Sequence, residues 1–305
     1  MTPEVGEAPR KPTRLSGGEW VAVFKRTFSQ FIADDCMGLA QQVAYSSLLA
    51  FFPAAVALVG FLDLINAYDA LESFLNPVAP KAVTDLIHSF QQDSGGGGSI
   101  VALVIGLVAA VWVASGAMGS VVKSVNKAYD RMETRPFWKV RLISIILVLA
   151  SGIVTAGMLL LIVMGGTLGD AISRRTNAGG AFLWAWDLLR WPIAFAIVLL
   201  LFGLVYGLAP NTERRSLSWL SPGALVAGLM WLALSGLFAL YTSLSSSYSK
   251  TYGALAGGIV LLLWLNYTAW AILFGAELNS ELARQADIHA AGGEHAGLTR
   301  PARRR

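Results

Sequence analysis

The sequence predicts an all-α membrane protein, built as a bundle of six transmembrane helices. Hydrophobic residues make up 55% of the chain and charged residues only 14%, which is not the composition of a soluble globular protein. The apolar residues form six runs, each close to the ~20 residues that a helix needs to cross a bilayer. Strands of a membrane barrel would alternate apolar and polar residues, whereas these runs are apolar on all sides. The six runs cover residues 43–65, 99–122, 142–164, 191–209, 222–244 and 254–276.

The basic residues predict the orientation of the bundle. Of the 23 Lys and Arg residues, 18 fall on the side of the two termini and five on the opposite side. Cytoplasmic segments carry the excess of Lys and Arg in membrane proteins, so we expect both termini in the cytoplasm. Attraction to anionic membrane lipids explains this basic excess. No face combines a dense basic patch with stacking aromatic residues, so nucleic acid is not an expected partner.

The segment before the first span is expected to hold a tail and a surface helix. Residues 1–15 are polar and lack periodicity, which predicts a disordered cytoplasmic tail. Ser16 and Glu19 have the spacing of a capping box, and apolar residues then recur at helical spacing. They are Trp20, Val23, Phe24, Phe28 and Phe31. An amphipathic helix lying on the cytoplasmic surface is the prediction.

The membrane domain is expected to cover residues 16–284. Its first external loop contains apolar residues at helical spacing between 83 and 90, followed by glycines at 95–98, which predicts a short external helix and a hinge. Pro53 lies near the middle of the first span and should kink it, either as a structural feature or as a gate. Residues 285–305 are basic and poor in apolar side chains, so a disordered cytoplasmic tail is expected.

Small residues four positions apart predict close helix contacts in the bundle. The pairs are Gly203 with Gly207 and Gly253 with Gly257. Such spacing lets two helices approach closely in lipid. These glycines are therefore interpreted as packing or hinge residues.

Polar residues at membrane depth are the first candidates for function, because they are costly in lipid and usually turn inward. Asn266 lies near the middle of the sixth span and Tyr45 in the first. They could form a polar seam between these helices, or Asn266 could simply hydrogen-bond a neighbouring helix for about 1 kcal/mol. Both interpretations stay open at this point.

A second group of polar residues flanks the cytoplasmic ends of the spans. It consists of Asp34, Asp35, Asn126, Glu277 and Asn279. If the helices converge there, the group forms a polar mouth that binds a cation or a lipid headgroup. Ordinary anchoring of helix ends at the interface is the alternative.

The sequence offers no catalytic apparatus. The three histidines, His88, His289 and His295, are scattered over a loop and the tail, and no His, Cys or carboxylate group has metal-ligand spacing. Nor does the chain contain a nucleophile elbow, a P-loop or a dinucleotide fingerprint. We therefore expect neither a cofactor nor enzymatic activity.

Several segments resemble the YihY/virulence factor BrkB family of bacterial inner-membrane proteins, over roughly residues 20–279. The most specific are SKTYGALAG at 249–257 and GAELN at 275–279. Others are AYSSLLAFFP at 44–53, RWP at 190–192 and PGAL at 222–225. Ser46 departs from the family pattern, in which a second aromatic residue is common at that position.

The resemblance implies six spans, a location in the bacterial plasma membrane and a role in envelope integrity. It also brings an old ribonuclease label, ribonuclease BN, which the sequence does not support, because a phosphodiesterase would need several metal ligands converging in water. Two functions stay open: a transporter or lipid-handling protein, and a scaffold that binds lipids or partner proteins without transport. Expected partners are membrane lipids, with a homo-oligomer or envelope proteins as further possibilities.

Overall fold

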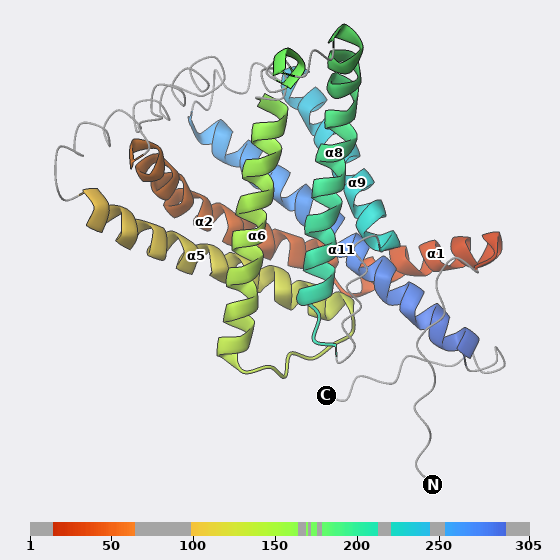
Figure 1. The fold of residues 1–305 in the computed structure, drawn as a ribbon. Helices are drawn as coiled ribbons and strands as arrows, with labels where there is room; N and C mark the ends of the chain where they lie inside the picture. The colour runs from red at the N-terminus through yellow and green to blue at the C-terminus, as the bar shows by residue number, and fades with distance from the viewer. Residues whose placement is uncertain are drawn as a thin grey trace.

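The computed structural model describes most of the helical part of the chain (Figure 1). The described residues are 15–64, 99–163, 169, 172–175, 179–212, 221–244 and 254–290. Their regular structure is entirely α-helical. The predictions for the two terminal tails fall wholly or partly outside these residues, as do those for the first external loop and for Gly253.

Among the described residues, seven helices have defined bounds, six of them long and apolar and one shorter. They are α1 (Gly17–Ala33), α2 (Cys36–Leu64), α5 (Ser99–Ala128), α6 (Phe137–Val163), α8 (Gly179–Leu208), α9 (Pro222–Leu244) and α11 (Ala254–Ala290). Five segments of the described chain are long and apolar enough to cross a membrane: Leu107–Ala128, Phe137–Met158, Phe182–Leu208, Pro222–Tyr241 and Gly257–Ala286. The protein is therefore a multi-pass membrane protein. α2 has 29 residues and continues through Pro53.

Most helices are longer than the apolar runs that predicted them, and two of them by more than ten residues. α8 starts at Gly179 rather than near residue 191, and α11 continues to Ala290 rather than ending near 276. Residues 285–290 are thus helical, not part of a disordered tail. A hydropathy run marks only the stretch that lipid can cover, whereas backbone hydrogen bonding carries a helix on into its polar end.

A tight turn connects α1 to α2. Ser16 and Glu19 close the capping box at the start of α1, with the Ser16 amide donating to Glu19 Oε2 at 2.7 Å. After Ala33 the chain turns through Asp34 and Asp35, and Asp35 has a φ of 52°. Its carboxylate accepts a hydrogen bond from the Gly38 amide at 3.3 Å, so Asp35 caps α2.

The core lies where α2, α5 and α11 meet. α2 packs along α5, and α11 packs against both α9 and α2 (Figure 1). Small residues on α2 permit this contact, among them Cys36, Ala40 and Ala44, all of which are buried. Within the five spans only 17% to 39% of the residues are buried. Most of the surface of each span is therefore available to lipid.

The glycines predicted to mediate packing differ in their surroundings. Gly203 and Gly207 are buried on α8. Gly257 is exposed on α11, and a Cβ placed there would have no atom within 4 Å. The contact expected from Gly257 is therefore absent from the described part of the chain.

Candidate functional site

One group of polar residues ties the end of α5 to the end of α8. We call Asn126, Glu133, Arg135 and Asn211 the loop cluster. The Asn126 side-chain amide donates to Glu133 Oε2 at 2.7 Å, and its oxygen accepts from the Asn211 backbone amide at 2.7 Å. Asn126 is only 2% exposed, so its side chain is cut off from water, and both its nitrogen and its oxygen have hydrogen-bond partners in the protein.

Arg135 completes the loop cluster and closes the C-terminus of α8. Its guanidinium donates from Nε and Nη2 to the two oxygens of Glu133, at 2.7 and 2.6 Å. Nη2 also donates to the Ala209 carbonyl at 2.7 Å, so the cation lies beside the carbonyl end of the helix. Hydrogen bonds from Arg135 hold the pKa of Glu133 below its usual value.

The motif residues Gly223 and Gly275 bring the backbones of α9 and α11 into contact. A Cβ on Gly223 would overlap the Gly275 carbonyl, and one on Gly275 would overlap the Tyr206 hydroxyl. Asn279 supports the crossing: its oxygen accepts from the Gly223 amide at 2.9 Å, and its nitrogen donates to Ser221 Oγ at 3.0 Å. We call Gly223, Gly275 and Asn279 the α9–α11 crossing. Only glycine fits at its centre.

A buried acidic group lies beside the start of α2. Glu277 on α11 is 0% exposed, and the Cys36 thiol donates to its Oε1 at 3.6 Å. Asp34, which is also buried, and Lys127 both act electrostatically on Cys36. The structure therefore brings Asp34 and Glu277 to the same neighbourhood, whereas Asp35 is exposed and caps α2.

α1 is held across the second half of α11. Arg26 Nε donates to Glu281 Oε2 at 3.0 Å, and its Nη2 donates to Gln285 Oε1 at 2.6 Å. Beside these bonds, Val23 packs with Leu278 and Leu282. The phenyl rings of Phe31 and Phe274 lie 5.8 Å apart. One face of α1 is thus fully used by α11.

Two polar atoms on α11 at membrane depth lack partners among the described residues. Asn266 Oδ1 and Trp270 Nε1 are enclosed, and neither makes a hydrogen bond. With Glu277 they occupy one face of α11, since residues four and seven positions apart share a helix face. We call Asn266 and Trp270 the depth pair.

Neighbouring tryptophans show how such atoms are usually satisfied. Trp264 Nε1 donates to Ser235 Oγ at 3.2 Å, and Trp231 Nε1 donates to Thr268 Oγ1 at 3.2 Å. Both bonds join α11 to α9. The polar atoms of α11 that face α9 thus have hydrogen-bond partners, whereas the two atoms of the depth pair, on another face of the helix, have none in the described chain.

Tyr45 is not part of this arrangement. Its side chain is 60% exposed on α2. The Asn266 oxygen has no hydrogen-bond partner in the described chain, and Tyr45 is thereby excluded as one. The structure brings Asn266 together with Trp270, a residue that the sequence argument did not select.

Comparison with known proteins assigns the chain to a family. The sequence profile described as virulence factor BrkB matches residues 27–298. The chain belongs to this family. A BrkB relative in Bacillus subtilis, called putative ribonuclease-like protein YfkH, is 32% identical over 270 residues, covering 87% of this chain and 96% of the relative.

Other relatives extend the comparison to longer proteins. A UPF0761 membrane protein of Xanthomonas oryzae pv. oryzae is 26% identical over 270 residues, which are 83% of this BrkB chain and 59% of that protein. A second UPF0761 membrane protein, from Xanthomonas axonopodis pv. citri, matches to the same extent. The chain thus spans about three fifths of the length of the Xanthomonas proteins. No solved structure matches it significantly.

The family motifs quoted above gain a physical explanation from the structure. Gly223 of PGAL and Gly275 and Asn279 of GAELN meet at the α9–α11 crossing, and Glu277 of GAELN faces α2.

The sequence argument did not select Arg135 or Trp270 as site residues, because an interfacial arginine and a span tryptophan are common in membrane helices. In the described part of the chain, no three His, Cys, Asp or Glu side chains come together as a metal site.

Proposed function

We propose that this BrkB family protein is a transporter or lipid-handling protein of the bacterial inner membrane, with six spans and both termini in the cytoplasm. The observation that carries the proposal is the depth pair. Asn266 Oδ1 and Trp270 Nε1 are enclosed on a membrane-spanning helix without a hydrogen-bond partner in the described chain. α2, with 29 residues, supplies the sixth span.

The energetic argument favours a role beyond packing. A buried polar group without a partner costs about 1–3 kcal/mol, and polar groups in spans usually line substrate or ion pathways. An acceptor and a donor one helical turn apart suit a hydroxyl, an amide or water, each of which can donate and accept. Glu277 lies on the same face, nearer the end of the span. A polar solute or lipid headgroup could thus move along this face.

Reconstituted liposomes test the proposal. Scrambling of fluorescent phospholipids and flux of protons and monovalent cations would be followed in parallel for the wild type, Asn266→Leu and Trp270→Phe. We expect an activity in the wild type that falls at least about tenfold in both variants, since each removes one polar contact. Trp264→Phe is the matched control, because it removes a bond that joins α9 to α11. Wild-type protein inactive in every lipid and gradient would refute the proposal.

A non-transporting scaffold is the second candidate, and a specific observation favours it. Asn126 and Asn279, two of the residues expected to form a polar mouth, use both ends of their side chains in contacts between helices and loops. A scaffold would support the envelope of a deletion strain equally well with wild-type, Asn266→Leu or Trp270→Phe protein at equal levels. Loss of complementation by these two variants would instead favour transport.

The proposed topology has its own test. Reporter fusions at both termini should show cytoplasmic activity, as the basic residues predict. A reporter placed in the loop before α5 should show activity on the opposite side of the membrane. A fusion that placed the termini on different sides would exclude an even number of spans.

A further inference from the structure

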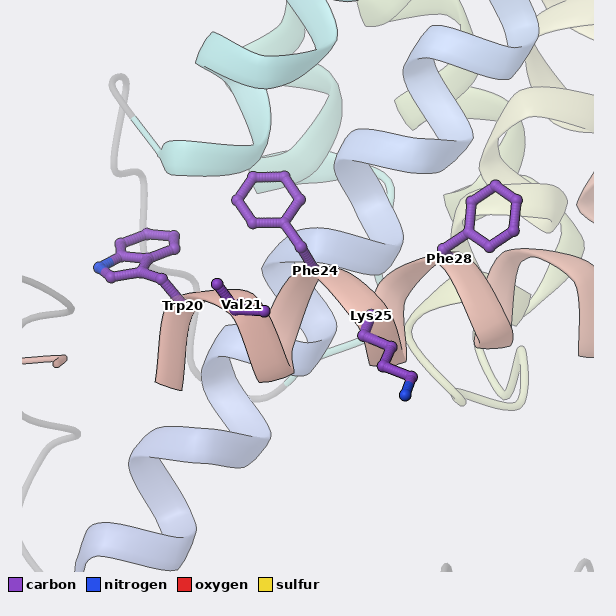
Figure 2. Close-up of a pocket in the computed structure, with 5 residues that line it drawn as sticks. All are labelled: Trp20, Val21, Phe24, Lys25 and Phe28. Carbon is purple, nitrogen blue, oxygen red and sulfur yellow. The ribbon is translucent and has the colours of Figure 1, made fainter. Parts of the chain in front are cut away.

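An apolar strip on α1 is exposed and is not covered by any helix of the described chain. It is lined by Trp20, Val21, Phe24, Lys25 and Phe28 around a shallow concave volume of about 720 Å³. Figure 2 shows Trp20, Phe24 and Phe28 projecting from one side of the helix and Lys25 from the other. Phe24 is 39% exposed and Phe28 59%. Bulky aromatic side chains in such positions need an apolar environment.

The sequence predicted a single apolar face on α1, but in the structure its residues point in two directions. Val23 and Phe31 turn toward α11, where they pack with Leu278 and Phe274. Trp20, Phe24 and Phe28, at intervals of four residues, form a separate row beside them. Arg26 fixes the rotation of α1 through its bonds to α11. Phe24 and Phe28 therefore stay directed away from the core, while Trp20, at the start of the row, packs against the edge of the cluster formed by Val23 and Leu278.

We propose that this aromatic row is a lipid-binding surface, on which α1 lies in the plane of the membrane with the acyl chains of phospholipids against Trp20, Phe24 and Phe28. Lys25 then lies at the level of the phosphate headgroups. The inference needs only the multi-pass membrane architecture and does not depend on transport.

The position of α1 along α11 favours lipid as the occupant. The apolar α11 residues that α1 contacts are Phe274, Leu278 and Leu282, and all three lie in the second half of the candidate span Gly257–Ala286. α1 therefore lies beside the C-terminal half of this candidate span, where α11 continues into its polar end. Aromatic residues are enriched near the ends of spans, and in-plane helices combine an apolar face with basic residues on the other.

The aromatic row is also continuous with an exposed apolar surface of the candidate span on α9. Trp20 packs against the same small cluster as Val226 of α9. Next to Val226, Leu225 is 42% exposed, and Leu229, one turn further, is 53% exposed on the same membrane-spanning helix. Figure 2 shows the aromatic side chains on the side of α1 where α9 lies. One apolar surface thus runs from the span onto α1, as expected where a bilayer covers both.

Depth-dependent fluorescence quenching tests the proposal. Phe24→Cys, Phe28→Cys and, as the matched control on the polar side, Ser29→Cys would each carry an environment-sensitive fluorophore. The proteins would be studied in liposomes of phosphatidylethanolamine and phosphatidylglycerol. Wild-type protein is the blank, because its single cysteine, Cys36, is buried. We expect phospholipids brominated on their acyl chains to quench labels at 24 and 28 at least about twofold more than at 29.

Three outcomes would overturn the proposal. Equal quenching at all three positions would show that the row does not enter the acyl region, as would stronger quenching by aqueous iodide at 24 and 28 than at 29. Disulfide dimers of Phe24→Cys would show that a second copy of the chain covers the row.

A measurement on unmodified protein guards against misfolded variants. Phospholipids with a photoreactive group at mid-chain should label the wild-type peptide that contains Trp20, Phe24 and Phe28 as strongly as peptides from the middle of α9. Labelling of α9 without labelling of that peptide would also refute the proposal.

Discussion

Two polar regions of this protein, one at the end of the bundle and one at membrane depth, differ in how their hydrogen bonds are used. In the loop cluster, Asn126 bonds through both ends of its side chain to Glu133 and Asn211. In the depth pair, Asn266 Oδ1 and Trp270 Nε1 are enclosed with no partner in the described chain. The same residue type, asparagine, thus has both ends of its side chain bonded in one region, whereas in the other its side-chain oxygen has no partner in the described chain.

This difference distinguishes polar side chains that hold the structure together from those that are candidates for function. Polar groups that bond to one another hold helix ends and loops in place, and their loss should lower stability. Enclosed polar groups without partners already destabilise the resting structure, so their removal should cost little stability. Substitutions in the two regions should therefore act on different observables. The predictions below are ordered by the size of the expected effect.

The largest effect is expected at the α9–α11 crossing. Gly275→Ala places a Cβ against the Tyr206 hydroxyl, the Gly223 carbonyl and the Ala227 side chain. Separating these helices should cost about 3 kcal/mol. The measurement is the yield of monodisperse protein in detergent, together with its thermal unfolding midpoint.

Gly257→Ala is the control for that substitution. A Cβ there has no atom within 4 Å, and alanine favours a helix more than glycine does. We expect an unchanged or slightly raised midpoint. Equal destabilisation by the two substitutions would show that the crossing is not the tight contact described.

Substitution of the two asparagines should affect stability differently. Asn126→Leu leaves the Asn211 amide and one Glu133 oxygen without this partner, which should lower stability by about 2 kcal/mol. Asn266→Leu removes an oxygen that already lacks a partner, so the unfolding midpoint should not fall. Thermal unfolding of both variants in one detergent measures the contrast. A larger loss in Asn266→Leu would mean that its oxygen bonds to something outside the described residues.

The sequence predicted the architecture better than the site. Apolar runs located α5, α6, α9 and α11, because hydropathy responds to the lipid environment of each span. Their pairing could not be predicted, since Gly223 and Gly275 lie on different helices and nothing local shows that they meet. The contact between Tyr45 and Asn266 could not be predicted for a similar reason, because rotation about the helix axis is set by packing: Tyr45 is 60% exposed, and the Asn266 oxygen has no partner in the described chain.

The candidate mouth residues illustrate the same limit. Asp34 and Asp35 are neighbours in sequence, yet one is buried near Cys36 and Glu277 and the other caps α2 in solvent. Only the turn at Asp35, with its positive φ, separates these roles. The sequence did contain a signal for the role of Asp35, because an aspartate directly before an apolar run is a common N-cap.

A smaller contrast is expected between two tryptophans of α11. Trp264→Phe removes the bond to Ser235 that joins α11 to α9 and should cost about 1 kcal/mol. Trp270→Phe removes an indole nitrogen that has no described partner, so stability should be kept. Unfolding midpoints at matched protein concentration provide the comparison. Equal losses would indicate that ring volume, not hydrogen bonding, determines both effects.

The smallest effect should appear in the pH dependence of the loop cluster. Arg135 and Asn126 hold the pKa of Glu133 below its usual value of 4.5, so the folded protein binds this proton less readily than the unfolded chain. The carboxylate therefore stabilises the fold above the usual pKa, and its contribution is lost as pH falls through the lowered folded pKa. Glu133→Gln should unfold at a slightly lower temperature than the wild type at pH 7. The gap should close as the pH falls below the usual range of a glutamate, whereas a gap independent of pH would mean that the ionised carboxylate does not hold this loop.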